Sequence, residues 1–177
     1  LCTEAVGIIG VQNFAHNPAP HFFWVAFLLL FAYISAIVGG LWQYIDPFRT
    51  ISLWLAGNRP NRAVPRWMPY IAPVLFIALL WFELMSGKGS VPMVVSAVFL
   101  EYAGLCLLMS YLYGVETWFG NGEFFSMFFG LIGKIAPIRL HDDRVEIALP
   151  SEHLVYERAG HMGILLFILV MLGSTVV

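Results

Sequence analysis

Residues 22–44 read FFWVAFLLLFAYISAIVGGLWQY, a run of 23 residues without a charged side chain. A helix needs about 20 consecutive, mostly apolar residues to cross the hydrocarbon core of a bilayer. The run therefore predicts a transmembrane helix. Three further stretches satisfy or approach the same criterion, at residues 67–84, 91–113 and 162–177. The last stretch stops after 16 residues, so we expect the protein to continue beyond it.

The overall composition agrees with a membrane protein. Hydrophobic residues make up 60% of the 177 residues and charged residues 11%, against roughly 45–50% and about 25% in soluble domains. The mean hydropathy is +0.81. With a net charge of −2, the chain offers no basic field for a nucleic acid. We expect a single all-α, polytopic membrane domain over residues 1–177, in contact with the lipid bilayer, with at least four transmembrane helices.

One short helix is predicted directly after the first span. Asp46 precedes a proline, which is a typical helix start, and Gly57 is a typical helix end. Within residues 47–56, Phe48 and Trp54 fall on one apolar face. This pattern favours a helix that lies in the membrane interface.

A second interfacial or half-inserted helix is predicted over residues 124–138. The segment is apolar but short, and it contains Lys134 and Pro137. A polar loop follows at residues 139–160, where apolar and polar side chains first alternate as they do in a short strand or hairpin.

The basic residues predict how the chain is oriented in the membrane. Eight of the nine Lys and Arg residues fall in the loops 45–66 and 114–160. Basic residues are enriched in cytoplasmic loops of membrane proteins. We therefore expect both loops in the cytoplasm and the N-terminal segment on the outside.

Glu101 is the first candidate site residue, because it sits at least ten residues from either end of the predicted span 91–113. A carboxylate near the middle of a membrane is costly and marks a candidate functional site. It would carry protons or contact a cofactor or substrate, or it would be a protonated side chain bonded to a neighbouring helix. Ala97 and Gly104 lie on its face, so we expect this face to meet protein.

A candidate metal site comprises His153, Glu157 and His161, which recur every four residues. Side chains four residues apart converge on one face of a helix, and His and Glu are ligands for divalent metals. A His-Asp-Asp triplet at 141–143 lies just upstream. A bound divalent metal ion would lower the pKa of a water molecule and support hydrolysis. The alternative is a polar membrane-interface segment without a metal.

Small residues in the first predicted span indicate close helix packing. Ala32, Ala36 and Gly40 recur every four residues. Such ladders let helix backbones approach closely inside membranes. The packing partner is either another helix of this chain or a separate membrane protein subunit.

Five motifs occur along the chain in fixed order. They are NPAPHFFW at 17–24, IDPFRT at 45–50, YGVETW at 113–118, GEFFSMFFGL at 122–131 and IAP at 135–137. Together they resemble the bacterial polytopic membrane proteins of the fenitrothion hydrolase family. The resemblance covers nearly the whole chain and implies a location in the bacterial cytoplasmic (inner) membrane and hydrolysis of an organophosphate triester.

The resemblance marks Arg49, Glu116, Trp118 and Glu123 as signature positions. Glu116 and Glu123 flank a Gly-Asn-Gly turn, and together they could act as a catalytic acid and base. Alternatively, they bind Arg49 or Arg139 and fix the interfacial helix. Two functions therefore stay open. The first is a non-catalytic subunit that packs against other membrane proteins, and the second is a membrane-embedded hydrolase that depends on a metal.

Overall fold

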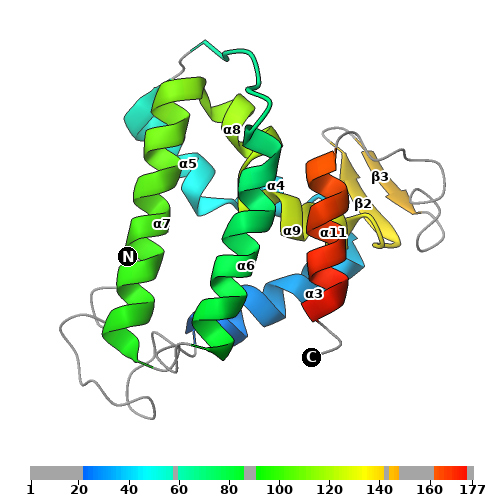
Figure 1. Cartoon of the computed structure of the whole chain (residues 1–177). Coiled ribbons are helices and arrows are strands. Elements are labelled where there is room, and N and C mark those ends of the chain that lie inside the picture. The colour runs from blue at the N-terminus through cyan, green and yellow to red at the C-terminus, as the bar shows by residue number, and fades with distance from the viewer. Residues whose placement is uncertain (1–21, 58–59, 86–90, 142–143, 148–161, 175–177) are drawn as a thin grey trace.

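The computed structural model describes residues 22–57, 60–85, 91–141, 144–147 and 162–174, and helices dominate its all-α architecture. A small three-stranded sheet with the order β1-β2-β3 lies at one edge (Figure 1). The elements are η1 (Phe22–Leu30), α3 (Phe31–Ile37), β1 (Val38–Gly39), α4 (Trp42–Ile45), α5 (Pro47–Ala56), η2 (Met68–Tyr70), α6 (Ile71–Leu84), α7 (Pro92–Tyr113), α8 (Val115–Asn121), α9 (Phe124–Gly133), β2 (Ile138–His141), β3 (Arg144–Ile147) and α11 (Met162–Ser174).

Among the described helices, α7 alone is long and apolar enough to cross a membrane. It has 22 residues, and only 22% of its most apolar window is buried inside the protein. A core helix of a soluble protein would be mostly buried. The other apolar helices are shorter. The structure therefore supports one of the four predicted transmembrane spans. The shorter helices are Phe22–Ile37, Met68–Leu84, Phe124–Gly133 and Met162–Ser174.

The prediction of one continuous helix over residues 22–44 is wrong. The chain leaves the helix after Ile37, and β1 pairs in parallel with β2, with Val38 opposite Ile138. Gly40 then adopts a φ of 83°, which glycine tolerates and other residues rarely adopt. Gly40, the glycine of the predicted packing ladder, therefore lies beyond the end of the helix.

Helix α5 begins and ends as the sequence predicts. Asp46 is its N-cap, and Gly57 follows it with a φ of 70°. The predicted shared face is wrong, however, because Phe48 is buried against the protein whereas Trp54 is 81% exposed. Helix α5 packs on α7, and the buried side includes Ser52 rather than Trp54.

Helix α9 is the shortest apolar helix, and it lies at the centre of the molecule. Its ten residues begin after the N-cap Glu123. Phe124, Phe125 and Phe129 are buried, and α9 packs against both α3 and α6. Figure 1 shows α9 running crosswise to the upright helices α6 and α11. The segment is thus too short to span a bilayer, as predicted, but it is a core element of this chain.

Two glycines allow α9 to approach the first helix closely. A Cβ atom on Gly39 would lie 2.4 Å from the backbone oxygen of Gly133. In the predicted ladder, Ala32 and Ala36 come before Gly39 in the chain and Gly40 comes directly after it. Ala32 packs against the core. Since α3 contacts α9, this face is used at least in part within the chain. The predicted hairpin after α9 is confirmed by the antiparallel pairing of β2 and β3.

Candidate functional site

Two buried carboxylates begin two of the helices. Asp46 is 2% exposed and Glu123 is 1% exposed. Asp46 Oδ1 accepts hydrogen bonds from the backbone N–H groups of Phe48, at 2.9 Å, and Arg49, at 3.1 Å. Glu123 accepts in the same way from Phe125 N–H, at 3.0 Å, and from Ser126 N–H, at 2.5 Å. Both carboxylates thus satisfy donors that a helix start leaves unpaired.

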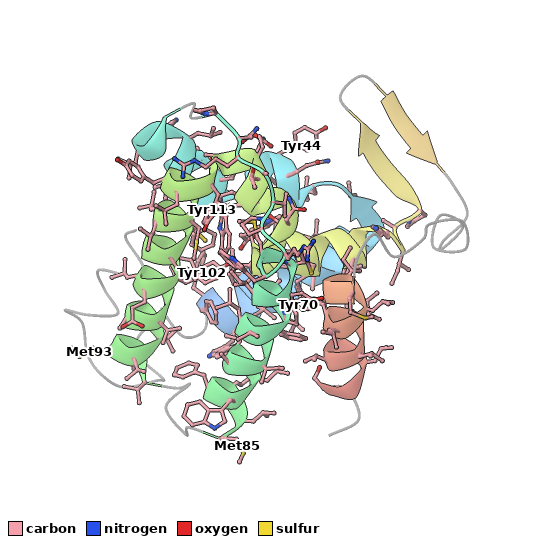
Figure 2. The ribbon with its side chains drawn as sticks, turned by 45° about the horizontal axis from the view of Figure 1, so that its top comes forward. Tyr44, Tyr70, Met85, Met93, Tyr102 and Tyr113 are labelled. Carbon is pink, nitrogen blue, oxygen red and sulfur yellow. The ribbon has the colours of Figure 1, made fainter. Side chains whose placement is uncertain are left out.

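Glu123 also connects α9 to the middle of α7. The hydroxyl group of Tyr102 donates a hydrogen bond to Glu123 Oε1. Tyr102 lies about halfway along α7, between the end marked by Met93 and the end marked by Tyr113 (Figure 2). The side chain of Glu123 therefore holds three donors from two helices, which fixes where α9 starts.

Burial makes both carboxylates weaker acids than usual. Burial raises the pKa of Asp46 to about 7, and the nearby charge of Glu123 adds to the increase, while the N–H groups and the charge of Arg49 oppose it. Burial also raises the pKa of Glu123, although hydrogen bonds from Tyr102 and Ser126 favour its charged form. Two neighbouring carboxylates resist being charged together. The pair therefore takes up a proton more readily than isolated carboxylates.

A polar cavity of about 600 Å³ reaches the Asp46 side of this pair. Its wall includes Arg49, Glu116, Ser126 and Lys134, together with several glycines. Asp46 Oδ2 is buried and has no hydrogen-bond partner among the described residues. A buried polar atom without a partner is costly. Asp46 Oδ2 is thus a buried acceptor beside this cavity that can still bind a proton or a donor group of a ligand.

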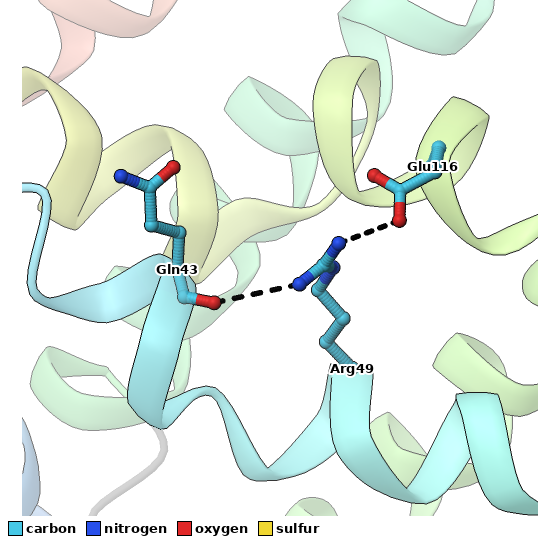
Figure 3. A network of polar contacts seen from close by, with 3 residues as sticks. All are labelled: Gln43, Arg49 and Glu116. Atoms are coloured by element: carbon cyan, nitrogen blue, oxygen red, sulfur yellow. Dashed lines mark hydrogen bonds and ion pairs between the residues drawn. The ribbon is translucent and has the colours of Figure 1, made fainter. Parts of the chain in front are cut away.

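Arg49 and Glu116 form an ion pair on the same cavity wall. Arg49 Nη2 lies 2.5 Å from Glu116 Oε1, and Arg49 Nη1 donates to the backbone oxygen of Gln43 at 3.5 Å (Figure 3). The side chains of Arg49 and Glu116 are 33% and 58% exposed. Such exposed pairs contribute little stability. The pair does, however, connect α5 to α8 and orient both charges toward the cavity.

The structure gives the predicted candidates different surroundings. Glu116 pairs with Arg49, which is the structural alternative raised from the sequence, and Glu123 bonds to the hydroxyl group of Tyr102. Glu101 is exposed on α7 and lines a different, apolar cavity. A catalytic role for these three glutamates stays a prediction.

The predicted metal ligands His153, Glu157 and His161 lie outside the described residues. Within the part of the chain that the structure describes, no three His, Cys, Asp or Glu residues are grouped so that they could hold a metal ion. A divalent metal therefore stays a prediction that concerns residues 141–161.

The sequence identified Asp46 only as a helix cap and did not single out Tyr102. The available signal for Asp46 was its position, because an acid two residues after a 23-residue uncharged run has apolar neighbours to bury it. Tyr102 had no such signal, because its partner Glu123 lies 21 residues away in the chain. Trp118, a signature residue of the resemblance, is fully buried.

This chain matches no family model, no curated protein and no solved structure. The resemblance to the fenitrothion hydrolase family therefore stays an expectation from the sequence motifs. The function proposed below is therefore based on the contacts and the exposed surfaces of this chain.

Proposed function

We propose that this chain is an integral membrane subunit that packs inside a larger membrane protein assembly and does not itself catalyse a reaction. The observation that carries the proposal is the distribution of polarity. Asp46 and Glu123 are buried, whereas many large apolar side chains are exposed. Soluble monomers rarely expose wide apolar surfaces, and such surfaces face lipid or protein partners.

The exposed apolar side chains form stripes along α6 and α11. These two helices pack against each other, and each presents apolar residues every three to four positions on its outer side. This spacing places the side chains on one face of a helix. The residues are Val74, Ile77 and Trp81 on α6 and Leu165, Leu169 and Leu172 on α11.

Crosslinking from these stripes tests the proposal. A photoreactive amino acid is placed at Leu169 or Val74, which are 64% and 62% exposed, and at the buried Phe129 as a control. We expect adducts with proteins of defined mass from the two exposed positions and none from position 129. If the exposed positions give only lipid adducts, the chain works without partner subunits and the proposal is wrong.

We also propose a multi-pass arrangement in the bacterial cytoplasmic membrane, with loops 45–66 and 114–160 in the cytoplasm and the N-terminal segment outside. The described parts of both loops meet near one end of α7, because the hydroxyl group of Thr117 donates to the backbone oxygen of Arg62 at 3.1 Å. A cysteine at Asn61 should resist a membrane-impermeant thiol reagent in intact cells, and one at Ser90 should react. Reaction at Asn61 from outside would reverse the orientation.

The second candidate is a membrane-embedded hydrolase of the fenitrothion hydrolase type, with a divalent metal. The observation that favours it is the polar cavity, which combines Arg49, Lys134 and the weakly acidic Asp46 on one wall. Cationic side chains can stabilise an anionic phosphoryl transition state, and a carboxylate of raised pKa can act as a general base. The metal would bind at His153, Glu157 and His161.

Release of nitrophenol from a nitrophenyl phosphotriester tests the second candidate on purified protein with added divalent metal. The hydrolase predicts turnover that His153→Ala or His161→Ala abolishes, while membrane insertion is unchanged. The subunit proposal predicts no turnover above that of a Glu116→Gln control. Stoichiometric metal together with turnover would favour the hydrolase over the subunit.

A further inference from the structure

An apolar cavity of about 400 Å³ lies between α6 and α7, apart from the polar cavity described above. The two helices stand side by side (Figure 1), and residues of both helices line the cavity. Its volume falls in the range typical of small-molecule sites, about 300–1,000 Å³. Seven of its 13 lining residues are aromatic, among them Trp81, Phe82 and Phe99.

Glu101 is the charged residue on the wall of this cavity. Its side chain is exposed, and it has no hydrogen bond or ion pair with any described residue. A carboxylate in the middle of an apolar helix is expected to have a partner, because an unpaired charge in a medium of low polarity is costly. The described part of the chain does not supply that partner.

The charged side chains of α6 and α7, the two helices that line the cavity, are all acidic. Neither α6 nor α7 contains Lys or Arg, and their ionisable acids are Glu83 and Glu101. Aromatic faces also carry negative charge density and attract cations, above all quaternary ammonium groups. A neutral acyl chain would fill the volume but leave Glu101 unpaired, whereas an apolar cation would satisfy both the carboxylate and the aromatic wall.

We propose that the cavity between α6 and α7 binds a lipophilic organic cation, such as an ammonium or phosphonium ion that carries apolar groups. The positive centre lies near Glu101, and the apolar groups contact Phe82, Phe99 and Leu79. The ligand enters from the apolar surface of the protein, where Glu101 is exposed. This site is independent of the proposed subunit role, because it uses contacts within one chain.

Binding of radiolabelled tetraphenylphosphonium to the purified protein in lipid nanodiscs tests the proposal. We expect saturable binding that weakens about tenfold or more in Glu101→Gln, because the variant keeps the shape of the side chain but removes its charge. Glu83→Gln is the matched control. Glu83 lies on α6 but does not line the cavity, so this variant should bind as the unchanged protein does.

Two further measurements are needed. The first tests whether Glu101→Gln is still folded, and the second tests whether the cation binds through its charge rather than by apolar partitioning. The thermal unfolding midpoint of Glu101→Gln should match that of Glu83→Gln. Neutral triphenylphosphine oxide should not displace the cation at concentrations where an alkylammonium ion does. The proposal is wrong if tetraphenylphosphonium binding is not saturable, if both glutamine variants bind equally, or if the neutral compound competes as well as the ammonium ion.

Discussion

Glu123 and Glu101 occupy opposite environments in this chain. Glu123 is 1% exposed and accepts hydrogen bonds from Tyr102 and from two backbone N–H groups of α9. Glu101 lies one residue from Tyr102 but is exposed and has no partner among the described residues. Both residues of α7 line the apolar cavity, but of the two only Tyr102 also reaches the hydrogen-bonded polar interior at Glu123.

The difference arises from where helices begin. Asp46 and Glu123 each precede a short helix whose first N–H groups need acceptors, so their burial is offset by hydrogen bonds. Glu101 lies inside a continuous helix whose N–H groups are already bonded along the backbone. A carboxylate at such a position has no free backbone N–H group nearby, so its hydrogen-bond partner has to come from outside the helix.

Replacing Glu123 should have the largest effect on stability. Glu123→Ala removes the N-cap of α9 and leaves the hydroxyl group of Tyr102 without its acceptor. We expect a loss of about 2–4 kcal/mol, from one lost cap and one unsatisfied buried donor. Thermal unfolding in detergent micelles measures it. Glu116→Gln is the control, because Glu116 is exposed, and an equal loss in both variants would contradict the buried-cap interpretation.

Asp46→Asn tests whether the polar interior holds a proton. Because burial raises the pKa of Asp46 to about 7, its contribution to stability is fully present below its ordinary pKa, about 3.9, and is lost as the pH rises through 7. The unchanged protein should therefore lose about 2 kcal/mol between pH 5 and pH 7 relative to Asp46→Asn. Asparagine keeps the helix cap but does not titrate. Parallel stability curves for the two proteins over this range would show that Asp46 stays charged.

Gly39→Ala tests the packing that encloses the polar interior. The new Cβ would lie 2.4 Å from the backbone oxygen of Gly133, so β1 and α9 must separate. We expect a loss of about 1–2 kcal/mol from this overpacking. Gly130→Ala on α9 is the matched control, because a Cβ there meets nothing within 4 Å. If both variants unfold at the same temperature, the close contact of β1 with α9 does not stabilise the chain.

The sequence predicted those features that depend on local signals. The start of α5 at Asp46, its end at Gly57 and the hairpin after α9 follow from residue types at short spacing. The interruption at Val38 and Gly39 depends on pairing with Ile138, about 100 residues away in the chain, and apolar composition alone does not reveal it. The sequence offered Arg49 as one possible partner of Glu116, but for the same reason it did not identify Tyr102 as the partner of Glu123.

Glu101→Gln should have the smallest effect on stability, and this sharpens the contrast with Glu123. Glu101 makes no hydrogen bond or ion pair with the described residues, so removing its charge breaks no contact that the structure shows. Surface substitutions of this kind change the free energy of unfolding by less than about 0.5 kcal/mol. Thermal unfolding without any added organic cation is the measurement, and Glu83→Gln serves as its reference. A loss as large as that of Glu123→Ala would mean that Glu101 has a structural partner, and the apolar cavity would then not be open to a ligand.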